Sequence, residues 1–221
     1  MESYQTVYRG GTGEIIEKKS RFIAEVYPIE SEGQAAQILE ETRKKYWDAR
    51  HHCWAYVLGR NPVAERMSDD GEPAGTAGKP ILEVIRGRKL TDVLVIVTRY
   101  FGGTLLGTGG LVRAYTSAAI DGLEHSESIT RIHGIKLLIR AEYTDLGKIQ
   151  YLLASRDVIQ LDPVYTDKVE LTALVPVEQI KGLKADLMEG TNGQAVLDET
   201  LQCWFAQTED GIRIFSEWVE E

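Results

Sequence analysis

The sequence predicts an α+β protein in which a β-sheet backed by helices is followed by a ferredoxin-like βαββαβ unit. Residues 93–97 form an unbroken apolar, β-branched run, which is typical of a strand buried on both faces. Residues 135–205 follow the order strand, helix, strand, strand, helix, strand, which is that of a split βαβ unit. The net charge is −1 over residues 1–133 and −8 over residues 134–221, so the composition also changes between the two parts.

The first part, residues 1–130, begins with apolar–polar alternation that predicts two strands within residues 4–29. Ser31 and Gln34 have the spacing of a capping box and predict a helix to about Lys45. The remaining elements expected in order are a strand at 51–58, a short strand at 63–67, a short helix at 81–85 ended by Gly87, the central strand, and a helix at about 109–125.

Residues 124–134 are polar and without periodicity, and they predict the connection between the parts. The second part, 135–206, is expected to contain strand 135–143, helix 145–156, strands 158–165 and 168–175, helix 176–189 and strand 195–205. The tail, residues 207–221, has enough apolar residues between 211 and 219 to pack against the rest of the protein, but the sequence does not predict where it packs.

The composition indicates a protein of the cytoplasm. Hydrophobic residues make up 43% and charged residues 27% of the 221 residues, as in globular proteins. No signal peptide and no apolar run of about 20 residues is present, so no membrane contact is expected. The two cysteines, Cys53 and Cys203, have no metal or redox spacing and are expected to be reduced. With a net charge of −9, DNA is not expected as a partner.

Five glycines lie in nine residues after the central strand: Gly102, Gly103, Gly107, Gly109 and Gly110. They indicate positive φ angles or a close approach to the backbone. A glycine loop before a helix exposes N–H groups that can bind an anion, and Arg99 and Arg113 flank this one. A branched side chain at Gly109 is therefore expected to block binding. Close strand-to-helix packing explains the glycines equally well, because neither the phosphate-loop nor the dinucleotide pattern is complete.

A second loop, residues 68–80, carries Asp69, Asp70 and Glu72 but no apolar anchor. We expect these carboxylates, in order of preference, to cap the next helix, to pair with Arg99 or Arg113, or to hold a divalent ion weakly. His51 and Cys53 share one face of a strand, which is too few ligands for zinc. No metal and no cofactor are expected.

Three long segments resemble the signature motifs of the IMPACT/YigZ family. They are Asp48–Cys53, Ser68–Pro80 and Arg99–Val112, and the resemblance covers about residues 1–125. It implies a fold shared with a ribosomal-protein domain and the GHMP kinases, with a four-stranded sheet backed by helices. Residues 135–205 resemble the small second domain of bacterial members, which is similar to the C-terminal domain of elongation factor G.

The resemblance also implies a link to translation control. Eukaryotic relatives act on the pathway that activates an initiation-factor kinase, by competing for a protein partner that bacteria lack. For bacterial members the family implies binding to nucleic acid or the ribosome. Residues 60–113 hold eight basic residues against six acids and form the most basic region of the chain.

Two hypotheses follow, and the sequence favours the first. The first part of the chain is a regulatory binding module for RNA, the ribosome or a translation factor. Alternatively, it is a phosphate- or nucleotide-handling enzyme, although no catalytic nucleophile–base pair is visible. In either case the glycine loop, the acidic loop and Arg99 are expected to form one cleft. The candidate binding residues are Arg99, Gly102, Gly103, Gly107, Gly109, Gly110, Arg113, Asp69, Asp70, Glu72, Lys79 and His51.

Overall fold

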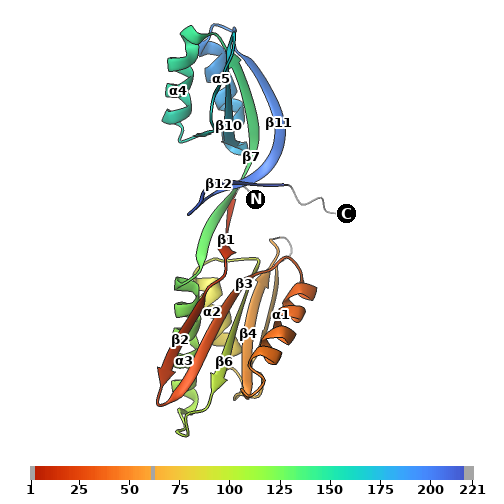
Figure 1. The fold of residues 1–221 in the computed structure, drawn as a ribbon, viewed down its shortest axis with the longest axis vertical. Helices are drawn as coiled ribbons and strands as arrows, with labels where there is room; N and C mark the ends of the chain where they lie inside the picture. The colour runs from red at the N-terminus through yellow and green to blue at the C-terminus, as the bar shows by residue number, and fades with distance from the viewer. Residues whose placement is uncertain (1–2, 61–62, 217–221) are drawn as a thin grey trace. The chain divides into compact units, whose positions relative to one another are not determined.

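The computed structural model describes residues 3–60 and 63–216, which divide into two compact units (Figure 1). The first unit is Gln5–Thr130. The second unit comprises the chain from Arg131 onward, together with the residues that precede Gln5. None of the helices in the described ranges is long and apolar enough to span a bilayer.

The first unit contains a five-stranded antiparallel sheet with strand order β2-β3-β6-β4-β5. The resemblance had implied four strands, so the sheet has one strand more than expected. Residues 4–29 form three strands and not the expected two, because the chain leaves the strand conformation at Gly10 and Gly11 as well as at the turn of Lys18 and Lys19, which have positive φ angles. The five strands of the sheet are β2 (Thr12–Glu17), β3 (Ser20–Pro28), β4 (His51–Leu58), β5 (Ala64–Ser68) and β6 (Val93–Tyr100), and β1 (Ser3–Arg9) precedes them in the chain and is not part of this sheet.

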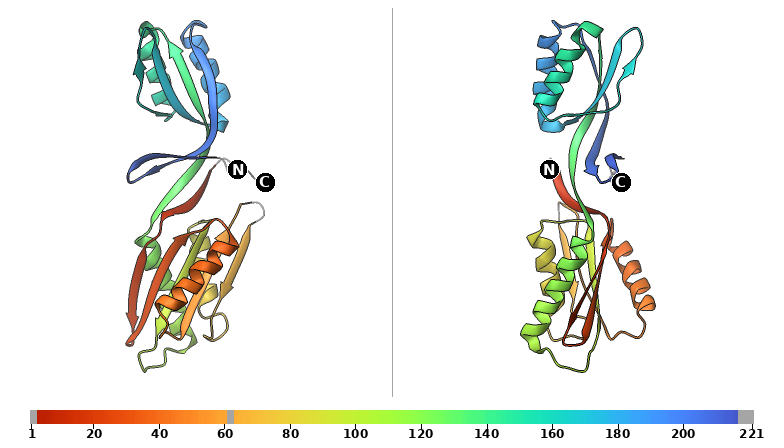
Figure 2. Two further views of the ribbon diagram at one scale, coloured as in Figure 1. Left: turned by 45° about the vertical axis from the view of Figure 1, so that its right-hand side comes forward. Right: turned by 60° about the vertical axis from the view of Figure 1, so that its left-hand side comes forward.

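Helices cover both faces of this sheet (Figure 2). The helix α1 (Glu32–Lys45) packs on one face, and α2 (Gly78–Gly87) and α3 (Gly107–Glu124) pack on the other. Ser31 caps α1 as predicted, since its hydroxyl accepts the N–H of Gln34 at 3.1 Å. In return, the Gln34 side chain accepts the N–H of Glu30 at 2.8 Å.

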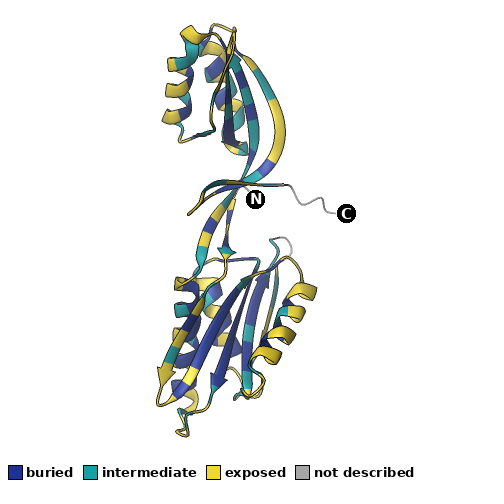
Figure 3. Ribbon diagram, viewed as in Figure 1, coloured by how far each residue is buried: buried dark blue, intermediate teal, exposed yellow. Residues whose placement is uncertain are grey.

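The strand β6 is the centre of the first unit. Every residue from Val93 to Arg99 is buried, which confirms the prediction of a strand covered on both faces (Figure 3). Its alternate side chains enter two separate apolar clusters, with Val95 facing α2 and α3, and Ile96 facing α1. Arg99 continues this buried run, so its charge must be compensated inside the protein.

The second unit has the strand order expected of a ferredoxin-like βαββαβ arrangement, with its first strand, β7, between β11 and β10. The second strand of the motif is divided into two short strands that both pair with β10. The elements are β7 (Glu127–Ala141), a 3₁₀ turn (Tyr143–Asp145), α4 (Leu146–Ser155), β8 (Ile159–Gln160), β9 (Val164–Tyr165), β10 (Val169–Pro176), α5 (Val177–Gly190), β11 (Val196–Thr208) and β12 (Gly211–Ser216).

The predicted connection, residues 124–134, contains the division between the two units, which falls after Thr130. It is not a loop, however, because β7 already begins at Glu127 and not at the expected residue 135, and the backbone of β7 pairs with β1 and β11. The sequence pattern assigned no place to the tail; in the structure β11 extends to Thr208 and Gly211–Ser216 forms β12 alongside it. Residues 217–221 lie outside the described ranges. Independent folding of residues 1–130 and 135–206 stays a prediction.

Candidate functional site

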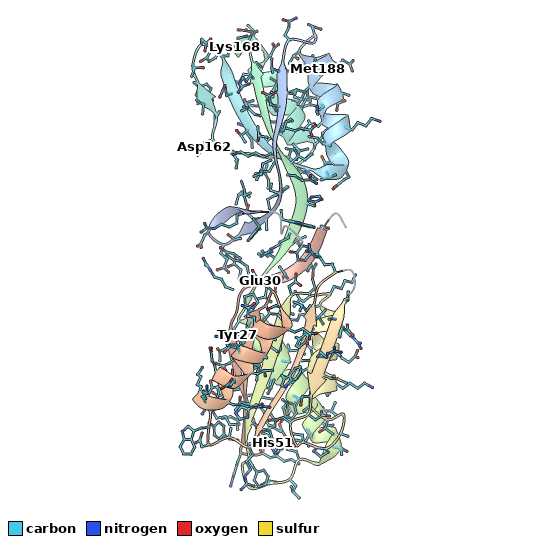
Figure 4. The ribbon with its side chains drawn as sticks, turned by 90° about the vertical axis from the view of Figure 1, so that its right-hand side faces the viewer. Tyr27, Glu30, His51, Asp162, Lys168 and Met188 are labelled. Carbon is cyan, nitrogen blue, oxygen red and sulfur yellow. The ribbon has the colours of Figure 1, made fainter. Side chains whose placement is uncertain are left out.

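A pocket of about 420 Å³ brings together side chains from all three sequence motifs. It lies in the first unit at the end where β4 starts and β6 finishes, and Figure 4 labels His51 at this end. Glu72 and Arg99 reach it from the acidic loop and from β6. The lining residues are Arg50, His51, Glu72, Pro73, Arg99, Phe101, Leu105, Leu106, Gly107, Thr108 and Leu111.

A buried ion pair forms the base of the pocket. Nη1 of Arg99 donates to Oε1 of Glu72 at 2.6 Å, and the two side chains are only 7% and 4% exposed. The guanidinium carbon of Arg99 also lies over two aromatic rings, 5.3 Å from the centroid of Phe22 and 5.6 Å from that of Phe101. The charge of Arg99 is therefore compensated inside the protein by Glu72, the one carboxylate of the acidic loop that points inward.

The guanidinium keeps an unused donor. Nη2 of Arg99 is 3.4 Å from the hydroxyl of Ser20. Nε is buried and has no hydrogen-bond partner among residues 3–60 and 63–216. A buried donor without a hydrogen bond costs free energy. The hydrogen-bonding capacity of Arg99 is therefore not fully used by the residues that the structure describes.

Beneath the ion pair lies a buried polar network that sequence analysis missed. The hydroxyl of Tyr115 donates to Oε1 of Glu72 at 2.8 Å, and Sγ of Cys53 is 3.3 Å from that hydroxyl and 3.0 Å from the carbonyl of Asp69. Burial raises the pKa of both the Cys53 thiol and the Tyr115 phenol above their ordinary values. Both groups therefore keep their protons at neutral pH and act as fixed donors.

Asp69 caps a helix and does not line the pocket. Its carboxylate accepts the N–H groups of Gly75, Ala77 and Gly78 at 2.8, 2.9 and 2.8 Å, at the start of α2. Burial alone would raise the pKa of Asp69, but these three donors outweigh it and hold the pKa below its ordinary value. Capping was the first of the expected roles for these carboxylates.

Asp70 holds the acidic loop against β4 and α1. It adopts a φ of 41°, and its carboxylate accepts the N–H of His52 at 2.7 Å and a guanidinium N–H of Arg43 at 3.0 Å. Its carbonyl oxygen is 2.9 Å from Nδ1 of His51. A carbonyl can only accept, so Nδ1 of His51 carries a proton and donates it to Asp70.

The five glycines have three different roles. Gly103 and Gly107 have positive φ angles of 85° and 70°, whereas a Cβ on Gly102 would lie 2.0 Å from the backbone of Lys19. Gly109 and Gly110 lie within the first turns of α3 and have no positive φ. The expectation that Gly109 needs a conformation reserved for glycine is therefore wrong, and only Gly107 of the five lines the pocket.

Gly109→Ala is expected to raise the free energy of unfolding by about 0.5–1 kcal/mol, because alanine favours a helix more than glycine does. The nearest atom to its new Cβ is Nη1 of Arg113 at 3.6 Å, which is an ordinary contact. Gly107→Ala is the matched comparison and should cost about 1–2 kcal/mol, since its φ is left-handed. Urea denaturation of both variants measures the difference, and equal effects would contradict this assignment.

Two basic residues of the predicted site, Lys79 and Arg113, also lie outside the pocket lining. Lys79 lines a second pocket of about 450 Å³ with Gly75, Glu83 and Val112. Arg113 lies on an exposed turn of α3 and makes no ion pair with the residues that the structure describes. Neither residue contacts the pair formed by Arg99 and Glu72. In the described part of the chain, no group of three or more His, Cys, Asp and Glu residues could hold a metal ion.

Sequence analysis did not single out Arg50, Phe101 or Leu105. Phe101 and Leu105 are 51% and 84% exposed, and both lie in a glycine-rich loop where no strand or helix pattern assigns them to a core. An apolar side chain in such a loop is the signal that could have identified them. Arg50 immediately precedes β4, where strand patterning stops.

Fold and pocket together define a protein with two α+β units, of which the first presents a largely apolar pocket over a buried ion pair. The family description "Impact N-terminal domain" matches residues 18–123, and "Domain of unknown function (DUF1949)" matches residues 139–194. The chain belongs to the IMPACT family, as its three motifs predicted.

Relatives and a solved structure extend over most of the chain. IMPACT family member YvyE of Bacillus subtilis (strain 168) is 38% identical over 90% of this chain and 92% of its own length. IMPACT family member YigZ of Escherichia coli (strain K12) is 35% identical over 81% of this chain and 89% of its own length. A crystal structure described as that of a hypothetical protein is 33% identical, with a TM-score of 0.57, over 90% of this chain and 98% of that one.

Proposed function

We propose that this protein is a cytoplasmic, translation-associated regulatory binding protein that contacts its partner through the pocket of the first unit. Membership of the IMPACT family supports the link to translation. The observation that carries the proposal is the pocket itself, because the three motifs that define the family contribute its lining. Loop residues that a rigid scaffold holds together are typical of a binding site.

The chemistry of the pocket favours binding over catalysis. A nucleophile needs a depressed pKa or an adjacent base, but burial raises the pKa of the Cys53 thiol. Glu72 is committed to Arg99 and Tyr115, which leaves that carboxylate poorly placed to accept a proton from a substrate. The ionisable groups thus stabilise the shape of the pocket.

The lining also favours a protein partner over RNA. Phe101 and Leu105 expose large apolar side chains, which suits a protein surface. Binding RNA requires cations that neutralise several phosphates. Of the two arginines in the lining, Arg99 is paired with Glu72, and Arg50 makes no ion pair with the residues that the structure describes. A translation factor or a protein of the ribosome therefore fits best.

Capture from a ribosome-rich lysate tests this proposal, with the tagged full-length protein as bait. We expect the wild-type protein to retain a ribosomal protein or translation factor, identified by mass spectrometry, and retention to survive RNase treatment. Leu105→Asp should abolish retention, because it places a charge on an 84% exposed apolar side chain of the pocket. Ile16→Asp is the matched control, since Ile16 is 69% exposed on β2 in the same unit. Equal loss in both variants, or no translation component with the wild type, would refute the proposal.

One observation supports a second candidate, a phosphate- or nucleotide-handling enzyme. The helix α3 begins beside the pocket at Gly107 without a side-chain cap, and such a helix start attracts phosphate. However, Asp69 and Lys79, which this hypothesis would use, do not line the pocket. Turnover of ATP by the purified protein, lost in Gly107→Val, would favour the enzyme.

A further inference from the structure

We propose that the pocket binds the C-terminus of a protein partner, taking up a free carboxylate together with an apolar last side chain. This inference rests on the proposed function, because it specifies what the pocket of the first unit recognises. Three properties of the pocket lead to it: its charge, its unused hydrogen-bond donors and its apolar wall.

The lining has the charge of a site for a monoanion. Arg50 and Arg99 contribute two positive charges and Glu72 one negative charge, so the pocket carries a net charge of about one with His51 neutral. A carboxylate carries a single negative charge, whereas a phosphate monoester carries about 1.5–2 at neutral pH. Charge complementarity therefore favours a carboxylate.

Donors for a carboxylate are available at the same place. The first turn of α3 has N–H groups without a side-chain cap, since the N-cap residue Leu106 provides none, and Gly107 and Thr108 line the pocket. Independently, Arg99 also lines it with a side chain 93% buried (7% exposed) and an Nε that has no partner among the described residues. A helix start and a buried, incompletely satisfied guanidinium thus meet at one cavity.

The rest of the wall is apolar. It consists of Pro73, Phe101, Leu105, Leu106 and Leu111. A cavity of about 420 Å³ is small for a folded surface but large enough for the end of a peptide. In a C-terminal residue such as leucine, the carboxylate and the apolar side chain leave the same carbon. An internal aspartate or glutamate offers the carboxylate without that apolar group, so it matches the wall less well.

Capture of a C-terminal carboxylate by backbone N–H groups is a known mode of peptide recognition. RNA is the less suitable ligand, because it would bring several phosphates to a lining in which only Arg50 is an arginine without an ion pair to residues 3–60 and 63–216.

The test is an NMR titration of the ¹⁵N-labelled full-length protein that follows the amides of Gly107 and Thr108. The probe is an N-acetylated tetrapeptide that ends in leucine with a free carboxylate. Four other probes serve as comparisons. Two are C-terminal amides, one with the same sequence and one that also contains an internal glutamate. The third is a peptide with a free carboxylate that ends in glycine, and the fourth is inorganic phosphate. We expect the leucine acid to bind at least about tenfold more tightly than either amide, because a charge-assisted hydrogen bond is lost in the amides.

Arg50→Gln should weaken the leucine acid several-fold, because it removes one positive charge from the lining. Lys181→Gln removes one positive charge from an exposed residue of α5 in the second unit, outside the pocket, and should leave affinity unchanged. Equal affinity for acid and amide, tighter binding of inorganic phosphate, shifts of these amides with an RNA oligonucleotide instead, or no shift up to the solubility limit would each overturn the inference.

The outcomes separate this inference from the proposed function. If the lysate experiment retains a translation component through Leu105 but no peptide binds, only the carboxylate inference fails. If the peptide binds but no translation component is retained, the proposed function fails and the carboxylate site stands.

Discussion

Arg99→Ala is expected to lower the free energy of unfolding of the first unit by about 3–5 kcal/mol, because removing one partner of a buried ion pair leaves the other charge uncompensated. The carboxylate left behind is that of Glu72, whose side chain is 4% exposed. It would retain the hydroxyl of Tyr115 as a donor, but no countercharge. Urea denaturation followed by circular dichroism measures the loss.

The matched control is Arg21→Ala. Arg21 also pairs with a glutamate at 2.7 Å in the first unit, but its side chain and that of Glu14 are 51% and 38% exposed. Solvent screens such a pair, so the expected loss is below about 1 kcal/mol. The double variant Arg99→Met with Glu72→Leu should be more stable than either Arg99→Ala or Glu72→Ala. A loss from Arg99→Ala no larger than that of the control would contradict a buried pair.

Asp69→Ala is expected to cost about 2–4 kcal/mol, since three N–H groups at the start of α2 lose one charged acceptor. Asp69→Asn keeps an acceptor oxygen and should recover part of the loss. Asp48→Ala is the matched control, because Asp48 accepts one exposed bond, from the hydroxyl of Tyr100. Similar melting temperatures for the Asp69→Ala and Asp48→Ala variants would rule out the capping role.

The contribution of Asp69 also depends on pH. Folding lowers the pKa of the Asp69 carboxyl group below 3.8, its value in the unfolded chain. The ionised carboxylate therefore stabilises the folded protein above pH 3.8, and this stability is lost as the pH falls through the pKa of the folded state. The difference in stability between wild type and Asp69→Ala should therefore be constant near neutral pH and shrink below about pH 4. A difference that persists undiminished at pH 2 would exclude the ionised carboxylate as its source.

The elements with strong periodicity were predictable from the sequence, and those formed by pairing were not. The run Val93–Val97 and the Ser31 cap carry local signals, and the structure has both elements at those positions. In contrast, β12 and the start of β7 exist because other strands supply their backbone hydrogen bonds. Polar sequence in such a segment says nothing about a partner strand that lies far away along the chain.

The same division applies to the candidate site. Arg99 could be selected because it follows a buried strand and flanks the glycine loop, and pairing with a loop carboxylate was one of the expected roles. Which of three carboxylates within four residues turns inward depends on the loop backbone, including the left-handed φ of Asp70, and no local pattern specifies it. The contact from Tyr115 to Glu72 depends on how α3 lies on the sheet, so periodicity indicated a core position and not a hydrogen bond.

The pinned acidic loop has a consequence for how the pocket meets its partner. Asp69 and Asp70 fix the acidic loop, which forms one wall of the pocket, through hydrogen bonds to α2, β4 and Arg43. The loop therefore loses its conformational entropy when the protein folds and not when a partner binds. A partner that docks against Glu72 and Pro73 therefore incurs no ordering cost on that side. The contacts that the partner makes with this loop therefore contribute fully to its affinity, because the loop has the same conformation before and after binding.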